Sequence, residues 1–132
     1  SGSRLLYRAW KEERLLGMRL AELDEEDQRV NVNFLPAGTS YELHYDSCPI
    51  TAVVFLTSHE GEGGRCFCNE QGALKKVEPR AGLCVVGDFS QTLHCVAPVT
   101  RAPFRMSLLF GFGVPGHTAT RAARFLYEGR AD

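Results

Sequence analysis

The sequence lacks any apolar run near the roughly 20 residues that a helix needs to cross a bilayer. Its start also lacks the charged, apolar and small-residue regions of a signal peptide. No charge sign is in excess, because 15 Lys and Arg stand against 16 Asp and Glu, for a formal net charge of -1. General nucleic-acid binding requires a surplus of cations that displace phosphate counterions. We therefore expect neither a membrane protein nor a general nucleic-acid binder.

Cysteine is too scarce for a disulfide framework. The chain has five cysteines, and an odd number does not pair completely. We interpret Cys84 and Cys95, which lie in apolar stretches, as small packing residues. Cys66 and Cys68 would share a strand face, and we favour packing over half a zinc site because no second close pair completes a tetrahedral set. These thiols predict a reducing, intracellular location, cytoplasmic or nuclear.

What is present is one domain's worth of ordinary globular sequence: 132 residues, 44% hydrophobic and 23% charged. We interpret residues 1–28 as a supporting helical segment, with Ser1 to Ser3 a cloning remnant, and residues 29–132 as the main domain. Short strands are expected near 30–34, 51–57, 65–68, 74–77, 83–86, 92–96 and 104–112, with a short closing helix over 118–128. Many short strands at short intervals are typical of a sandwich or barrel rather than a parallel sheet.

The most informative motif is His44-Tyr45-Asp46. Side chains two apart on a strand share a face, so His44 and Asp46 would point together. His94 lies in another expected strand. If the two strands face each other, two imidazoles and a carboxylate converge, a set that suits non-haem Fe(II). The alternative is a hydrogen-bonded His44–Asp46 pair at a sheet rim, with His94 a satisfied core histidine.

Arg105 and Ser107 follow on a later strand and share one face. A guanidinium inside a barrel is costly unless an anion meets it, and a planar fork beside a hydroxyl makes a good carboxylate clamp. Arg101 competes for this role, but its place between two prolines favours an exposed turn. His59 lies in a glycine-rich loop and is expected to be solvated.

Taken together, these motifs make the chain resemble the Fe(II)/2-oxoglutarate-dependent oxygenase superfamily, in its prolyl-4-hydroxylase-like branch. The resemblance covers about residues 30–112. It rests on Pro36-Ala37-Gly38-Thr39-Ser40-Tyr41 leading into His44-Tyr45-Asp46, on 51–56, on Gly63-Gly64, on Val77-Glu78-Pro79-Arg80-Ala81-Gly82 and on His94-Cys95-Val96-Ala97-Pro98-Val99-Thr100.

The resemblance implies a mainly β fold: a double-stranded β-helix, or jelly-roll barrel, with an N-terminal supporting helix and a short C-terminal helix. It implies that His44, Asp46 and His94 are the iron ligands and that Arg105 binds the distal carboxylate of 2-oxoglutarate. Tyrosines that relatives place around the cosubstrate are replaced here by Leu35 and Phe55. Further cosubstrate contacts are therefore assigned to Thr51, Tyr41 and Ser107.

The implied activity is hydroxylation of a peptide or protein side chain, prolyl being the favoured target, coupled to oxidative decarboxylation of 2-oxoglutarate to succinate. Ascorbate is a candidate reductant, and a small-molecule substrate stays open. The alternative is a non-catalytic or weakly active jelly-roll module that binds a ligand or a protein partner. The short chain and the residues Leu35 and Phe55 motivate that second reading.

Overall fold

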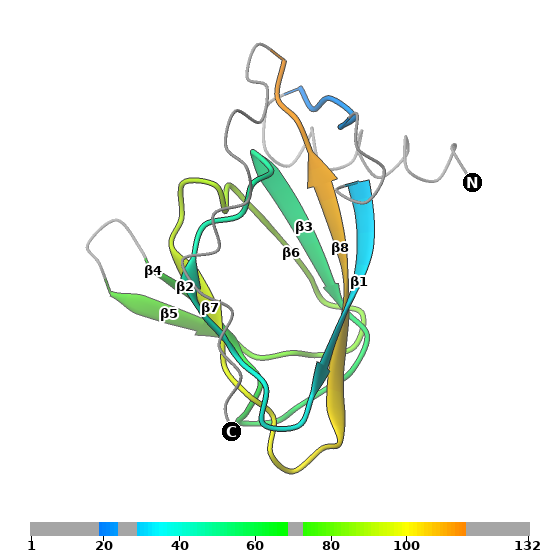
Figure 1. The fold of residues 1–132 in the computed structure, drawn as a ribbon, viewed down its shortest axis with the longest axis vertical. Coiled ribbons are helices and arrows are strands. Elements are labelled where there is room, and N and C mark those ends of the chain that lie inside the picture. Colours follow the sequence, from blue (N-terminus) through cyan, green and yellow to red (C-terminus); the bar gives the residue numbers. More distant parts are fainter. Residues whose placement is uncertain (1–18, 24–28, 69–72, 116–132) are drawn as a thin grey trace.

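The computed structural model describes residues 19–23, 29–68 and 73–115. Figure 1 shows that this part of the chain is built from strands. The eight strands are β1 (Val30–Pro36), β2 (Tyr41–His44), β3 (Ile50–Phe55), β4 (Arg65–Cys68), β5 (Leu74–Val77), β6 (Cys84–Gly87), β7 (His94–Val96) and β8 (Phe104–Phe112). Among the described residues, no helix is both long and apolar enough to cross a membrane.

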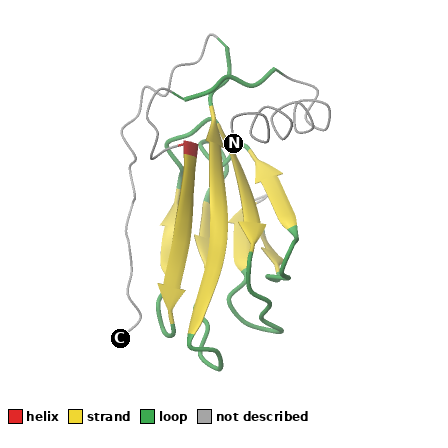
Figure 2. Cartoon of the chain, turned by 90° about the vertical axis from the view of Figure 1, so that its right-hand side faces the viewer, coloured by secondary structure: helices red, strands yellow, loops and turns green. Residues whose placement is uncertain are grey.

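The strands form two antiparallel sheets of four, with the orders β1-β8-β3-β6 and β2-β7-β4-β5. The sheets lie face to face (Figure 1), and their long strands run side by side (Figure 2). Eight antiparallel strands in two facing four-stranded sheets, with these strand orders, constitute a jelly roll. The expected mainly β jelly roll is thus confirmed.

The expected terminal helices fall largely on residues that the structure does not describe, the C-terminal one entirely. Within the N-terminal segment, residues 19–23 are not helical, which corrects that part of the expectation. Ala21 forms an isolated antiparallel bridge with Gly113, through reciprocal backbone hydrogen bonds of 2.8 and 2.7 Å. The chain is extended here, because the Ala21 amide donates its hydrogen bond to Gly113 and cannot also donate one within a helix.

The sheet β1-β8-β3-β6 contains the longer strands and is called the larger sheet, and β2-β7-β4-β5 is called the smaller sheet. Strand β3 is an inner strand of the larger sheet. Its sequence, Ile-Thr-Ala-Val-Val-Phe, is rich in β-branched residues that suit a pleated surface, and all six residues are buried between β8 and β6. Alternate residues serve two faces. One face carries an apolar cluster, formed by Ile50, Ala52, Val54, Phe110 and Phe112.

The other face of the larger sheet turns toward the smaller one and carries polar residues. Gly63, just before β4, shows this proximity. A Cβ built on Gly63 would lie 2.5 Å from Cγ1 of Val99 and 3.5 Å from Cδ of Arg105. Its φ of 66° is in the region that glycine tolerates. Arg105 therefore lies against the segments that enter β4 and leave β7.

Candidate metal centre

Two histidines face each other across the β2–β7 pair. His44 is the Cα partner of His94 in the antiparallel register, and their ring centroids are 4.2 Å apart. A register irregularity between Tyr41 and His44 places His44 at the end of β2. Both side chains are buried, with 5% and 0% of their surface exposed. The strand pairing therefore brings together two residues that are far apart in the sequence.

Backbone carbonyls fix which imidazole nitrogen faces the site. Nδ1 of His44 lies 2.6 Å from the carbonyl oxygen of Glu42, and Nδ1 of His94 lies 2.8 Å from that of Thr92. A carbonyl oxygen only accepts hydrogen bonds, so Nδ1 carries a proton in each ring. In the neutral ring Nε2 then presents its lone pair, the form in which imidazole binds a metal.

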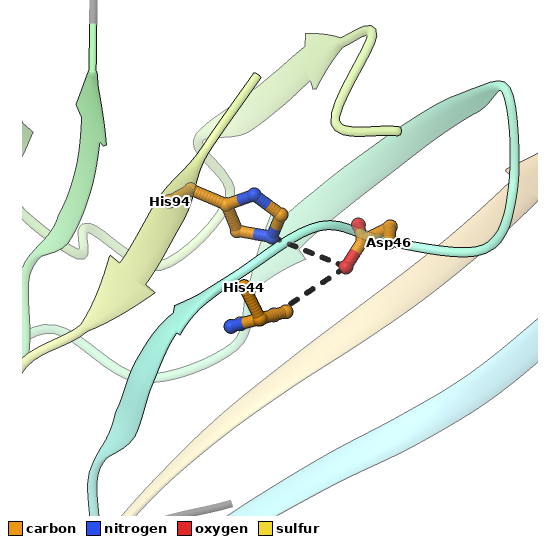
Figure 3. Close-up of side chains that lie close together, drawn as sticks. All are labelled: His44, Asp46 and His94. Carbon is orange, nitrogen blue, oxygen red and sulfur yellow. Dashed lines mark hydrogen bonds and ion pairs between the residues drawn. The ribbon is translucent and has the colours of Figure 1, made fainter. Parts of the chain in front are cut away.

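Asp46 completes the group from the connection after β2 (Figure 3). Its Oδ1 lies 3.1 Å from Nε2 of His94 and 3.5 Å from Nε2 of His44. The Asp46 backbone amide donates a 2.9 Å hydrogen bond to the carbonyl of Phe89, which ties this connection to the one between β6 and β7. The candidate ligand atoms of His44, Asp46 and His94 all lie within 4.8 Å of one another.

This arrangement fits a cation. With Nδ1 protonated in both rings, two Nε2 lone pairs and a carboxylate oxygen converge, and three acceptors do not satisfy one another. Either further protons make imidazolium rings that pair with Asp46, or a metal ion lies among the three groups. Two imidazoles and one carboxylate are the donor set of non-haem Fe(II) sites. The three predicted ligands are thus brought together.

Phe89 supports the group in a way that sequence reasoning missed. Its ring is buried and lies 4.9 Å, centroid to centroid, from the ring of His94. A Cβ built on Gly87 would come within 2.9 Å of the Phe89 ring, so only glycine leaves room for this ring. The available signal was Gly87 and Phe89 just upstream of a metal-ligand candidate.

Three of the four candidate cosubstrate residues, Arg105, Ser107 and Thr51, belong to the larger sheet, whereas Tyr41 lies on β2 of the smaller one. Arg105 and Ser107 on β8 are 1% and 0% exposed, and Thr51 on β3 is 4% exposed. The guanidinium carbon of Arg105 lies 5.1 Å from the ring centroid of Phe55. Within the described part of the chain, the hydroxyl oxygens of Thr51 and Ser107 are buried and make no hydrogen bond. Burying charge and hydroxyls in this way is costly, which favours a polar ligand between the sheets.

Three other predicted positions are also located. Tyr41 contacts the ring of His44, with centroids 6.0 Å apart, and its hydroxyl donates a 3.0 Å hydrogen bond to Oδ1 of Asn33. Leu35 is the strand partner of Arg105, and Phe55 that of Ser107. Both tyrosine replacements therefore lie beside the candidate cosubstrate residues.

His59 and Arg101 occupy different environments. Arg101 is exposed, as expected, and pairs with Glu62 at 3.7 Å. The expectation of a solvated His59 was wrong: it is 7% exposed, and Nε2 lies 2.8 Å from Oγ1 of Thr57. Burial, with a smaller contribution from the Arg105 charge, lowers the pKa of His59. The loop folds His59 inward against Gly63, a contact that the glycine-rich sequence did not reveal.

No family model matches the sequence, and no curated protein matches it. Solved structures do. A prolyl-4-hydroxylase from Pseudomonas putida is 27% identical over 66% of this chain and 51% of its own, with a TM-score of 0.58. A 2OG-Fe(II) oxygenase family oxidoreductase from Burkholderia pseudomallei is 19% identical over 71% of this chain and 47% of its own, with a TM-score of 0.60.

A third structure, HygX from Streptomyces hygroscopicus with nickel and 2-oxoglutarate bound, is 14% identical over 80% of this chain and 66% of its own, with a TM-score of 0.55. The two matches below 25% identity support the fold, and the prolyl-4-hydroxylase supports the branch. The chain spans about half the length of the first two proteins. The resemblance to the Fe(II)/2-oxoglutarate-dependent oxygenase superfamily, in its prolyl-4-hydroxylase-like branch, is confirmed.

Proposed function

We propose that this chain is an Fe(II)- and 2-oxoglutarate-dependent dioxygenase that hydroxylates a side chain of a peptide or protein. The observation that carries the proposal is the convergence of two imidazole nitrogens and one carboxylate oxygen inside a jelly roll. The likeness to a prolyl-4-hydroxylase supports a peptide or protein substrate with proline as its target. Ascorbate is the reductant we would add to an assay.

His44, Asp46 and His94 would hold the metal. The carbonyls of Glu42 and Thr92 accept from the two Nδ1 atoms, which fixes the ring orientation and keeps Nε2 aimed inward. Asp46 contributes the negative charge that offsets part of the charge of a divalent ion. Bound iron together with 2-oxoglutarate supplies the activation of dioxygen.

The larger sheet would bind the cosubstrate. Arg105, buried between the sheets, offers a planar fork of donors that matches a carboxylate. The Ser107 and Thr51 hydroxyls stand on the same face and can donate to the same ligand. The low exposure of these groups keeps water from competing for the bonds, which strengthens each interaction.

Anaerobic titration tests the proposal. Fe(II) and 2-oxoglutarate added together should produce the visible charge-transfer absorption of a chelated pair, and air with a proline-containing peptide should then release succinate. Absence of metal binding would overturn the metal centre. Succinate release that persists in His94→Ala protein would do so too.

The second candidate is a module that binds a ligand or partner without turnover. Leu35 and Phe55, apolar and paired with Arg105 and Ser107, favour it, because they offer no hydrogen bond to a cosubstrate. Metal binding without any absorption change on adding 2-oxoglutarate would support this candidate over the dioxygenase.

A further inference from the structure

Two thiols oppose each other on the smaller sheet, outside the candidate metal centre. Cys66 on β4 is the Cα partner of Cys95 on β7. His94, one residue before Cys95, is fully buried beside Asp46, so Cys95 points to the opposite face of the sheet. Lys76 on β5 opposes Cys66 from the other side and is exposed. Both thiols therefore lie on the outward face.

The strand register sets their separation. The amide of Ala97 donates a 2.9 Å hydrogen bond to the carbonyl of Gly64, two residues before Cys66. Hydrogen-bonded pairs recur at every second position of an antiparallel ladder, so Cys66 and Cys95 form such a pair, with Cα atoms about 5.5 Å apart. A disulfide joins Cα atoms about 4.4 to 6.8 Å apart. Both residues are half-buried thiols here.

The side-chain spacing predicts that such a disulfide would be strained. Opposed Cβ atoms in a ladder lie about 4.5 to 5.5 Å apart, with hydrogen-bonded pairs such as this one at the wide end, whereas a disulfide prefers about 3.5 to 4.5 Å. Bridging the pair requires a small inward movement of β4 and β7. A bridge that is strained and partly exposed is readily reduced again, which is typical of reversible rather than structural disulfides.

We propose that Cys66 and Cys95 are a redox modification site, forming a reversible cross-strand disulfide on reaction with a peroxide. One thiolate attacks a peroxide oxygen and breaks the O–O bond, giving a sulfenic acid and, after protonation, one water. The other thiol attacks the sulfenic sulfur, forms the S–S bond and releases the second water. The two sulfurs lose two electrons and two protons together, and hydrogen peroxide is reduced to two waters. A thiol such as glutathione reverses the bridge by exchange.

This site does not depend on the proposed oxygenase activity. The test therefore uses the full chain, reduced and then treated with a chelator, and exposes it to equimolar hydrogen peroxide. We expect the thiols counted after denaturation to fall from five to three. The mass should fall by two hydrogens, and dithiothreitol should restore both values.

Position is assigned with variants, because trypsin leaves Cys66 with Cys68 in one peptide and Cys84 with Cys95 in another. The double variant Cys68→Ser/Cys84→Ser should still yield the cross-linked peptide pair. Adding either Cys66→Ser or Cys95→Ser to this double variant should abolish the cross-linked pair. Cys66→Ala and Cys95→Ala, in the same background, are second variants if serine impairs folding. The proposal is overturned if the double variant loses the cross-link, or if oxidation gives dimers or sulfinic acids in its place.

Discussion

At the scale of single residues, the orientation of two imidazoles decides what the centre can bind. The carbonyls of Glu42 and Thr92 fix the proton of each ring on Nδ1. In the neutral form of each ring, the inward nitrogen then presents its lone pair toward Asp46 and the other ring, where a metal ion would lie. The same carbonyls hold both rings in place when no metal is bound, which lowers the ordering cost of metal binding.

Asp46→Asn separates charge from shape at the centre. The asparagine amide can donate to Nε2 of His94, 3.1 Å away, so the variant should fold, and without metal it should be at least as stable as the wild type. Changing a residue that only orients a metal ligand lowers metal affinity by ~10- to 100-fold. Because Asp46 would be a ligand itself, the Fe(II) or Ni(II) affinity of Asp46→Asn should fall by more than that. Anaerobic calorimetry measures this, and equal affinity in both proteins would exclude Asp46 as a ligand.

Arg105→Ala should weaken 2-oxoglutarate binding by about 10- to 100-fold, because a hydrogen bond to a charged group contributes about 1.5 to 3 kcal/mol. Metal affinity should stay unchanged, since Arg105 belongs to the other sheet. The charge-transfer titration gives both values. Arg101→Ala is the matched control, as that guanidinium is exposed. Arg105→Lys keeps the charge in case alanine impairs folding; if neither variant changes cosubstrate affinity, the clamp lies elsewhere.

At the scale of elements, the connections between strands hold the structure together. Glu62, in the β3–β4 connection, accepts hydrogen bonds from the backbone amides of Thr100 and Arg101 and from the Thr100 hydroxyl, at 2.8 to 3.1 Å. These bonds, the Thr100 amide first, lower the pKa of Glu62 to about 2. The carboxylate thus joins two connections, β3–β4 and β7–β8.

The lowered pKa gives this junction a pH dependence. A group whose pKa falls on folding contributes stability above its unfolded value, and the contribution is lost as pH falls through the folded value. The difference in unfolding free energy between wild type and Glu62→Gln should be largest above pH 4.5 and shrink toward pH 2. Urea unfolding across this range measures it. A pH-independent difference would mean that the carboxylate charge is not what joins the connections.

Gly87→Ala tests the support behind His94. The new methyl would meet the Phe89 ring at 2.9 Å, so either the ring or β6 must move. Overpacking of this kind costs about 1 to 3 kcal/mol, and metal affinity should fall with it because Phe89 contacts His94. Gly113→Ala is the control, since its Cβ would meet nothing closer than 3.5 Å. Equal effects of the two substitutions would rule out the Phe89 support.

Much of this element structure was predictable from the sequence. Glycines and prolines that separate short segments predicted strands at 65–68, 74–77 and 104–112, where the structure has β4, β5 and β8. The His-x-Asp spacing predicted that His44 and Asp46 point together, and the resemblance to the oxygenase superfamily implied His94 as the third member of the group. Phe89, the inward fold of His59 and the Cys66–Cys95 register were not predictable, because each depends on which strands become neighbours, and local pattern carries no information on that pairing.

At the scale of the whole molecule, the candidate ligands and the candidate clamp lie on different sheets. His44 and His94 belong to the smaller sheet, and Arg105 to the larger. Cosubstrate binding therefore requires both sheets to be folded and in contact. We therefore expect cosubstrate binding to be lost in the same transition in which the domain unfolds.

Val53, in the middle of β3 and 0% exposed, offers the test. Val53→Ala leaves a cavity in the larger sheet and should lower the urea midpoint. The cosubstrate-dependent absorption should be lost in the same transition as the far-UV circular dichroism, and the substitution should move both midpoints equally, as a two-state domain requires. Absorption that survives the loss of circular dichroism would contradict a clamp on the larger sheet.

The strand order also dictates when the protein can become functional during its synthesis. Val30 pairs with Phe110, so β1 cannot form its backbone hydrogen bonds until β8 has been synthesised. Contacts between residues this distant make folding slow, in the range of milliseconds to seconds for comparable β domains. Until β8 has left the ribosome, β1 remains an unpaired edge with valines and a phenylalanine, the kind of segment that aggregates. The nascent chain is therefore most in need of a chaperone just before β8 emerges.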